Sequence, residues 1–500
     1  MSQMTAPVLR TTPLHSVHAA AGAFFTDADG WRMPLRYSCA PTEHRAVRTS
    51  AGIFDLSHMG EIKVTGPGAA AALDRALVGR VSTVALGRSL RTMMVTGAGG
   101  VIDVLMVHHV GEHEYMVVSG AGNRKRVVAE LARRRDGHAC TIDDISTATA
   151  LITVQGPRTT EVLSGAVESG AGIPAALHPR ETGSPTDGGD CGPDVLCGST
   201  LLRRLRRHAA VRATAAGHSV LLARAGCTGE DGFELFCGAE DAVDLWTVIT
   251  GHAATLPARG RDDDGRPLPV LTPCGLAARE SLRLEAGVPL HGHELTESIT
   301  PWDASAGDAV DLDKPDFIGR RALAVRAGRE GAAGTTRLVA LIGRGRCAAR
   351  AGDGVFDLRG RRVGAITSGL LSPTLGRPIA LALLAPASPE EPAGDGHDVQ
   401  RRSGGRADPP HGGRHRALLP ANAVTPPARR EPAVAVDAAG RGEPLGQDED
   451  INILPQGSPG GRGTPPTRRR TAPTTSGRPA AQRRPKISPV GATSMRSAAG

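Results

Sequence analysis

The sequence predicts a mixed α+β protein, and three stretches carry this prediction. Residues 61–68 alternate apolar and polar side chains before a Gly-Pro-Gly turn, and the Ala-rich run 69–77 follows, which indicates a strand, a turn and a helix. Two apolar runs, 101–110 and 114–119, flank three turn residues and are typical of a β-hairpin. Short strand-like runs at 338–342, 362–369 and 379–384 favour a small β-rich domain near the end of the ordered region.

Between these stretches the pattern changes. Residues 164–200 lose periodicity and are rich in Gly, Pro, Thr and Asp, so we expect a loop or an insertion there. A strand is expected to follow at 219–223, and helices are expected at 239–251, 279–287 and 319–328.

The last part of the chain, 386–500, has no apolar run long enough for a regular element. A segment rich in Pro, Gly and Arg cannot offset the entropy of ordering, so we expect disorder. A frame-shifted translation of a GC-rich gene is the alternative, because such codons give Arg, Gly, Pro and Ala in any frame.

The formal net charge of +8 is concentrated in this tail. Residues 386–500 hold 17 Lys plus Arg against 11 Asp plus Glu, so the remainder is nearly neutral. Because the tail has no aromatic side chain for stacking on bases, nucleic acid is not an expected partner.

Cysteine spacing and hydropathy exclude other classes of protein. The eight cysteines include no C-x-x-C pair, which argues against a zinc site and a disulfide scaffold. No uncharged apolar run reaches about 18 residues, and no apolar signal core follows Met1. We therefore expect reduced thiols, no metal, no membrane segment and a cytoplasmic location.

Two motifs are the most informative, 224–234 (RAGCTGEDGFE) and 274–287 (CGLAARESLRLEAG). Weaker motifs share their order along the chain: Gly30-Trp31, 48–59, 155–157, 316–320 and 367–376. Together they resemble the folate-dependent aminomethyltransferases of the glycine cleavage system. The resemblance covers residues 12–384, apart from 164–200.

This resemblance implies a three-domain architecture around a folate cavity. Residues 12–330 would form a body of two interleaved α+β domains, 336–385 a truncated C-terminal β-barrel domain, and 386–500 the disordered tail. The implied reaction takes an aminomethyl group from the lipoyl arm of the H protein and passes its carbon to tetrahydrofolate, the co-substrate, with release of ammonia. Such chemistry needs orientation of the pterin and control of protonation, and it needs no metal.

The resemblance also implies three binding residues. Glu234 would grip the polar edge of the pterin, Arg279 would bind substrate, and Met59 would line the folate pocket. A carboxylate suits paired N–H donors, and a guanidinium fork suits a carboxylate. Glu234 could instead be a solvated strand charge, Arg279 could instead pair with other charges of its helix, and Met59 could instead be a core residue.

The strand 99–105 departs from the family. Members have two successive aspartates there, of which the second is catalytic, whereas Asp103 is followed here by Val104. Neighbouring strand residues point to opposite faces, so Asp103 could become the catalytic group only through a bulge or a register shift. Loss of a positioned acid or base costs about 10²- to 10⁴-fold in rate.

Other departures affect the cavity wall and the C-terminus. Arg91, Cys227 and Asp308 stand where the family has aromatic residues, whose flat faces suit a pterin. Cys227 has no histidine nearby in sequence that would make it a nucleophile. No closing strand pair is evident after Pro386, so we expect a barrel that lacks its edge strands.

Alternatives from different classes therefore stay open beside a working aminomethyltransferase. One is a catalytically impaired folate-binding relative, and another is a damaged product that folds poorly. One-carbon transfer linked to sarcosine or dimethylglycine oxidation is a further alternative. Relatives of that kind carry a flavin domain, however, and no G-x-G-x-x-G motif occurs in this sequence.

Overall fold

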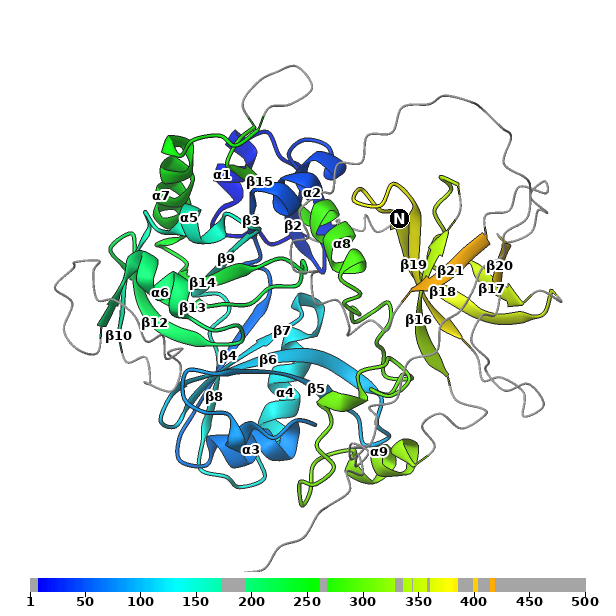
Figure 1. Cartoon of the computed structure of the whole chain (residues 1–500). Coiled ribbons are helices and arrows are strands. Elements are labelled where there is room, and N and C mark those ends of the chain that lie inside the picture. Colours follow the sequence, from blue (N-terminus) through cyan, green and yellow to red (C-terminus); the bar gives the residue numbers. More distant parts are fainter. Residues whose placement is uncertain are drawn as a thin grey trace, which may run out of the picture. The chain divides into compact units, whose positions relative to one another are not determined.

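Two β-sheets with interleaved strands, a two-stranded hairpin and a closed β-barrel form the framework of the protein (Figure 1). The computed structural model describes residues 8–171, 195–260, 268–328, 336–343, 345–357, 360–384, 399–402 and 414–418. These residues belong to one compact unit, Met1–Gln456. Within these ranges, no helix combines the length and the apolar character that crossing a membrane requires.

The first large sheet is antiparallel and has five strands in the order β5-β6-β7-β4-β8. Apolar side chains of the sheet and of helices α3 and α4 pack into one core, as expected for an amphipathic sheet covered on one face (Figure 1). The elements are β4 (Gly60–Thr65), α3 (Ala69–Ala76), β5 (Ser89–Val95), β6 (Val101–Gly111), β7 (Glu114–Ser119), α4 (Arg124–Arg134) and β8 (Thr141–Asp144).

The second sheet has eight strands in the order β11-β10-β12-β13-β14-β9-β3-β15, with only β15 and β3 parallel. Its strand β3 precedes the five-stranded sheet in sequence and β9 follows it, so the two sheets are interleaved along the chain. The strands are β3 (Ala51–Asp55), β9 (Thr149–Gln155), β10 (Val167–Ala171), β11 (Val195–Cys197), β12 (Ala210–Ala215), β13 (His218–Ala223), β14 (Gly232–Gly238) and β15 (Leu271–Pro273).

Helices and a hairpin complete this body. The hairpin pairs β1 (Phe24–Ala28) with β2 (Trp31–Arg36). The helices are α1 (His15–Ala20), α2 (Ala40–Thr49), α5 (Thr159–Leu163), α6 (Gly198–Arg204), α7 (Ala242–Thr255), α8 (Leu276–Glu285) and α9 (Arg320–Ala327). The expected helices at 239–251, 279–287 and 319–328 correspond to α7, α8 and α9, so the mixed α+β class is confirmed.

The stretch 164–200, expected to be a loop or an insertion, contains regular secondary structure at both ends. Strands β10 and β11 and the start of α6 fall within 164–200. Residues 172–194 lie outside the described ranges. The strands form where the sheet offers an edge: β10 pairs with β12, and β11 pairs with β10.

The barrel is closed, in the order β16-β19-β18-β17-β20-β21, with β21 pairing back to β16. The expectation of missing edge strands is therefore wrong for the described residues, because β20 and β21 lie beyond Pro386. Strand pairing uses backbone groups and does not require an apolar run, so these Arg-rich strands gave no clear signal. The strands are β16 (Arg337–Gly343), β17 (Gly354–Asp357), β18 (Arg362–Leu371), β19 (Pro378–Leu384), β20 (Val399–Arg402) and β21 (Arg414–Leu418). The rest of the expected tail lies outside the described ranges, and the domain boundaries stay a prediction.

Two glycines fix the turn between β5 and β6. Gly99 has a φ of +90°, a conformation that residues with a Cβ rarely adopt. A Cβ at Gly100 would lie 1.6 Å from the carbonyl oxygen of Glu297. The turn and the start of β6 are therefore held closely against the loop that contains Glu297.

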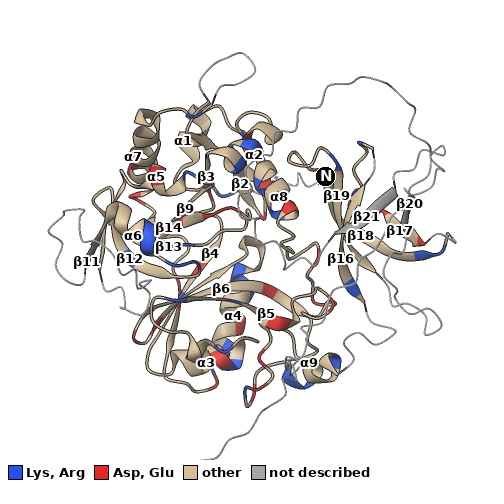
Figure 2. Cartoon of the chain, viewed as in Figure 1, with Lys and Arg blue, Asp and Glu red and all other residues tan. Residues whose placement is uncertain are grey.

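Glu285, at the end of α8, joins three parts of the fold. Its carboxylate accepts a hydrogen bond from Arg48 of α2 at 2.9 Å and lies 3.1 Å from His44 Nε2. It also accepts bonds from Ser372 Oγ at 2.5 Å and Thr374 Oγ1 at 2.8 Å in the barrel loop. Figure 2 shows acidic and basic residues close together on α8.

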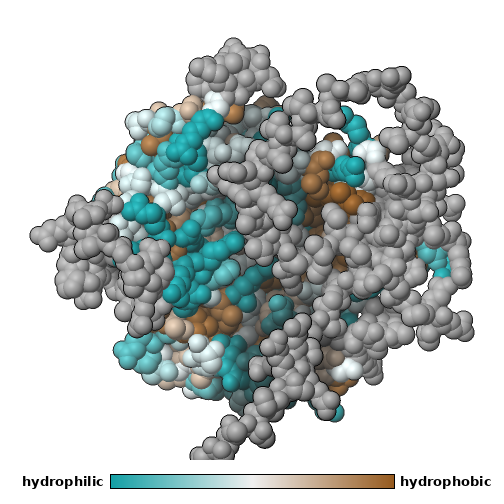
Figure 3. All heavy atoms as spheres, viewed as in Figure 1, coloured by the Kyte–Doolittle hydropathy of each residue, from teal (hydrophilic) through white to brown (hydrophobic). Residues whose placement is uncertain are grey.

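On the face that Figure 3 presents, the exposed apolar side chains of the described residues do not gather into one large area. On the face presented in Figure 3, apolar residues form small separate groups among hydrophilic ones. Scattered apolar residues of this kind are normal for a folded protein and mark no particular surface. The exposed large apolar residues are Val8, Phe24, Leu35, Leu86, Val243, Leu268, Val325 and Leu375.

Substitution Glu285→Gln is expected to lower the free energy of unfolding at pH 7 by about 1–3 kcal/mol. Burial alone would raise the pKa of Glu285, but hydrogen bonds from His44, Ser372 and Arg48 and the charge of His44 lower it to about 2. A depressed carboxyl pKa stabilises the fold above the unfolded value of about 4.5, and this contribution is lost as the pH falls toward 2. Urea unfolding at pH 7 and pH 3 should show a smaller acid loss in the variant. The matched change Glu280→Gln, at a half-buried position on the same helix, should lower stability by less, because Arg283 keeps its bonds to Glu294 and Ser368; equal effects of the two changes would contradict the assignment.

Candidate functional site

A small cavity of about 10 Å³ lies where β14, β9 and α8 meet. Its volume corresponds to about one water molecule. Polar side chains dominate one part of the wall and two apolar ones close the other. The lining residues are Phe54, Leu56, Thr153, Gln155, Gly226, Cys227, Thr228, Glu234 and Arg279. The sequence-predicted binding residues Glu234 and Arg279 are thus brought together.

Glu234 projects from β14, where it is paired with Thr153 of β9 and Ala223 of β13. Among the described residues its carboxylate makes no hydrogen bond or ion pair. Burial raises the pKa of Glu234 to about 7, and the charge of Arg279 acts in the opposite direction. A half-buried carboxylate without a partner and with a pKa near neutrality is typical of a functional site.

Arg279 lies in α8 and also lacks a partner. Its Nε is buried without a hydrogen bond to any part of the chain that the structure describes. The positive charge of Arg279 affects His58. Burial lowers the pKa of His58, and the charge of Arg279 adds to this effect, so that the pKa is about 4. Arg279 therefore faces a neutral histidine at pH 7 and remains free to bind an acidic or hydrogen-bond-accepting group.

Neighbouring charges that could have explained these two residues are occupied elsewhere. Asp231 accepts two bonds from Arg224, at 2.9 and 2.6 Å. Glu230 lies 3.0 Å from Arg48 Nη1. On α8, Glu280 pairs with Arg283. Pairing within the helix therefore does not account for Arg279.

Gln155 is a cavity residue whose contribution the sequence did not reveal. Its side chain accepts a bond from Thr228 at 3.0 Å and donates to the backbone of Ala225 at 2.9 Å. A Cβ at Gly226 or Gly232 would come within 2.1 or 2.3 Å of this amide, so both glycines permit close packing. Two polar residues spaced two apart on an otherwise apolar strand, Thr153 and Gln155, were the available signal.

The pair Asp103 and Val104 lies on β6, next to a β-bulge. Met94 pairs with Asp103 but Val95 pairs with Val101, so Ile102 is the extra residue. The Asp103 carboxylate is buried and accepts bonds from the backbone N–H of Gly120 at 2.8 Å and of Val104 at 2.9 Å.

Burial raises the pKa of Asp103, while bonds from Gly120 and Asn123 and the charge of His291 oppose the rise. Asp103 is not among the residues that line either cavity described here, whereas Val104 lines the larger one. The bulge that could bring Asp103 into the catalytic position is therefore present in β6. The Asp103 carboxylate nevertheless accepts hydrogen bonds from backbone N–H groups and lines neither cavity.

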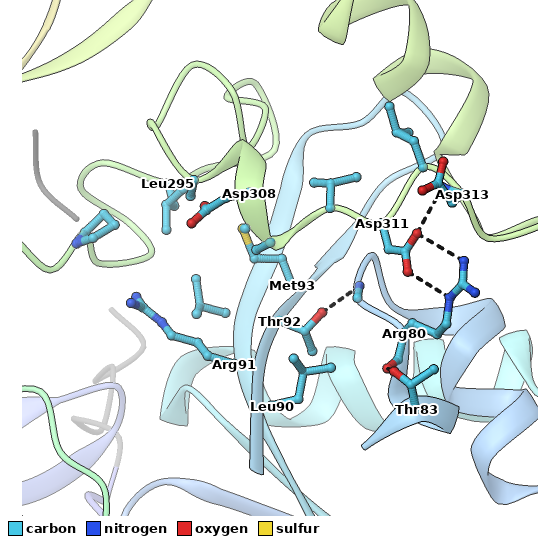
Figure 4. Close-up of a pocket in the computed structure, with 17 residues that line it drawn as sticks. Arg80, Thr83, Leu90, Arg91, Thr92, Met93, Leu295, Asp308, Asp311 and Asp313 are labelled. Carbon is cyan, nitrogen blue, oxygen red and sulfur yellow. Dashed lines mark hydrogen bonds and ion pairs between the residues drawn. The ribbon is translucent and has the colours of Figure 1, made fainter. Parts of the chain in front are cut away.

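This larger cavity has a volume of about 790 Å³ and is shown in Figure 4. It lies between β5, the segment 79–83 that follows α3, and the segments 289–295 and 306–313. Arg91 and Asp308, two of the three residues that the resemblance marks as departures at the cavity wall, line it. The third, Cys227, lines the small cavity and lies close enough to affect the charge of Arg91. The three departures therefore meet in one region.

Met59 does not line either cavity. It is half-buried and packs against an apolar cluster that includes Phe54, Leu56 and Met116. These contacts agree with the alternative of a core methionine.

The described ranges contain no group of three or more His, Cys, Asp or Glu side chains arranged to hold a metal ion.

Comparison with known proteins identifies the family. Residues 14–174 and 199–314 match the GCVT N-terminal domain, and residues 337–408 match the glycine cleavage T-protein C-terminal barrel domain. The chain is 44% identical over 385 residues to the aminomethyltransferase of Streptomyces coelicolor, covering 77% of this chain and 91% of that protein. It is 42% identical over 379 residues to the aminomethyltransferase of Corynebacterium jeikeium, covering 75% and 90%.

A solved structure agrees with this assignment. The glycine cleavage system aminomethyltransferase T from Bartonella henselae superposes with a TM-score of 0.64 at 29% identity, over 81% of this chain and 96% of that one. The family match covers both the interleaved body and the barrel. The chain therefore belongs to the glycine cleavage T-protein family of aminomethyltransferases.

Proposed function

We propose that this chain binds tetrahydrofolate and transfers to it the one-carbon unit of an aminomethyl group carried by the lipoyl arm of an H protein, with release of ammonia. The observation that carries the proposal is the unpaired Glu234 and Arg279 in one cavity. A cytoplasmic location, expected from the sequence, belongs to the same proposal.

Glu234 and Arg279 would act by binding. An ionised Glu234 accepts paired N–H donors from the edge of a pterin, and such charge-assisted bonds are strong and directional. Gln155 and Thr153 add neutral polar atoms to the same wall. The small cavity would take only the polar edge of a flat heterocycle, with Phe54 and Leu56 on its remaining wall.

The reaction breaks the bond between the aminomethyl carbon and sulfur and the bond between that carbon and nitrogen, and it forms two bonds from the carbon to folate nitrogens. The sulfur leaves as a thiol and the nitrogen as ammonia, so protons must be moved at the site. A positioned acid or base serves this step. Position 104 faces the cavity but carries an apolar side chain. This observation favours, as a second candidate, a folate-binding relative with impaired transfer.

Substitution Val104→Asp is expected to raise the rate of tetrahydrofolate-dependent ammonia release by about 10²- to 10⁴-fold, because it places an acid on the cavity wall. The measurement uses aminomethyl-loaded H protein and compares the two forms under identical conditions. Val104→Asn serves as the control, since it has a similar shape but cannot accept a proton at this pH. Rapid release by the unaltered chain, with no gain from the aspartate, would show that another group supplies the proton transfer.

Folate affinity is expected to rise as the pH increases through about 7. Burial raises the pKa of Glu234 to about 7, so the carboxylate that accepts N–H donors is formed only above this pH. Glu234→Gln should weaken binding of 5-formyltetrahydrofolate about 10- to 100-fold at pH 8 and should remove the pH dependence. Titration calorimetry at pH 6, 7 and 8 tests both effects. Glu230→Gln, in the loop just before β14 and paired with Arg48, should leave the affinity within about twofold; a pH-independent affinity of the unaltered chain would refute the role of Glu234.

A further inference from the structure

Arg91 is an unpaired cation on the wall of the 790 Å³ cavity. It lies on β5 opposite Met106 of β6, on the same face of the sheet as Met93 and Val104. Figure 4 shows its side chain extending from the strand on the side of the cavity where Asp308 lies. Its side chain is exposed to the cavity and therefore accessible to a ligand.

The second arginine of this cavity provides an internal comparison. Arg80 is paired with Asp311, with Nε 2.8 Å from Oδ2 and Nη2 3.2 Å from Oδ1. Across the residues that the structure describes, Arg91 makes no hydrogen bond and no ion pair. Two guanidinium groups thus line one cavity, and only Arg91 has all its donors available.

No side chain of the described residues neutralises Arg91 by direct contact. The nearby Cys227 and Asp308 act on its charge without forming a bond to it, and the guanidinium stays exposed. An acidic group in the cavity would supply the missing partner, and a planar guanidinium binds a carboxylate through two parallel N–H bonds.

Cys227 connects Arg91 to the site of the proposed function. It lines the small cavity together with Glu234 and Arg279, and it is also one of the two groups whose charge acts on Arg91. A ligand that places its polar edge at the small cavity and its body in the 790 Å³ cavity can therefore extend past Cys227 toward Arg91. Reduced folates have this form, with a pterin at one end and a benzoylglutamate carrying two carboxylates at the other.

We propose that Arg91 forms a carboxylate-binding subsite for the acidic tail of the folate. The proposal rests on the proposed function, because it assumes that a folate occupies the site. It assigns to this chain a preference for folates with an intact acidic tail.

The test measures dissociation constants of two probes by titration calorimetry at pH 8. The first probe is 5-formyltetrahydrofolate, and the second is 6-methyltetrahydropterin, which has no benzoylglutamate and no carboxylate. The variants are Arg91→Gln and, as the matched control, Arg80→Gln, which removes a charge from the same cavity that Asp311 already neutralises. Arg91→Gln should weaken 5-formyltetrahydrofolate about 10- to 100-fold and leave the pterin within about twofold, while Arg80→Gln should change neither.

Each outcome has one meaning. An unchanged affinity of Arg91→Gln for 5-formyltetrahydrofolate would overturn the subsite, and so would equal weakening of both probes, since the pterin cannot contact a tail subsite. Failure of the unaltered chain to bind either probe would instead overturn the proposed function itself. Partial recovery of the folate affinity in Arg91→Lys would support a role for the positive charge.

Discussion

The carboxylate of Glu285 is the contact on which the arrangement of the site depends. It joins Arg48 and His44 of α2 to the end of α8, and it holds the barrel loop through Ser372 and Thr374. Because α8 is a rigid element, fixing its C-terminal end also fixes Arg279, which lies nearly two turns earlier. The position of a cavity arginine is thus set by an ion pair outside the cavity.

A second constraint on the site is that most of the charged side chains around it are paired with a residue of opposite charge. Arg48 satisfies both Glu230 and Glu285, Arg224 satisfies Asp231, and Arg283 lies between Glu280 and Glu294. Partly buried charges are stable when they are paired and hydrogen-bonded. Within the described ranges, the side chains of Glu234, Arg279 and Arg91 make no hydrogen bond or ion pair, and all three line cavities. A folded protein retains such groups at a cost in stability, and ligand binding is the usual compensation.

Much of the architecture could be predicted from the sequence, because the apolar periodicity of β4, β6, β7, α7 and α8 is strong. The approach of Glu234 and Arg279 followed from their motifs and their resemblance to a family. The closing barrel strands were missed, since main-chain pairing leaves little trace in an Arg-rich segment. The hydrogen bonds of Asp103 could not be predicted from the sequence either, because one of them comes from the backbone of Gly120, 17 residues further along the chain.

The bulge at Ile102 allows the two adjacent residues Asp103 and Val104 to have different roles. Asp103 anchors the start of β6 to the segment before α4, while the side chain of Val104 lines the cavity and packs against the apolar cluster of Met93 and Val95. A change of the side chain at 104 therefore leaves the bond between Asp103 and Gly120 in place. Such a position can lose its chemical group in one mutational step and regain it in another without passing through an unfolded intermediate. Evolutionary gain and loss of activity are thereby separated from the maintenance of the fold.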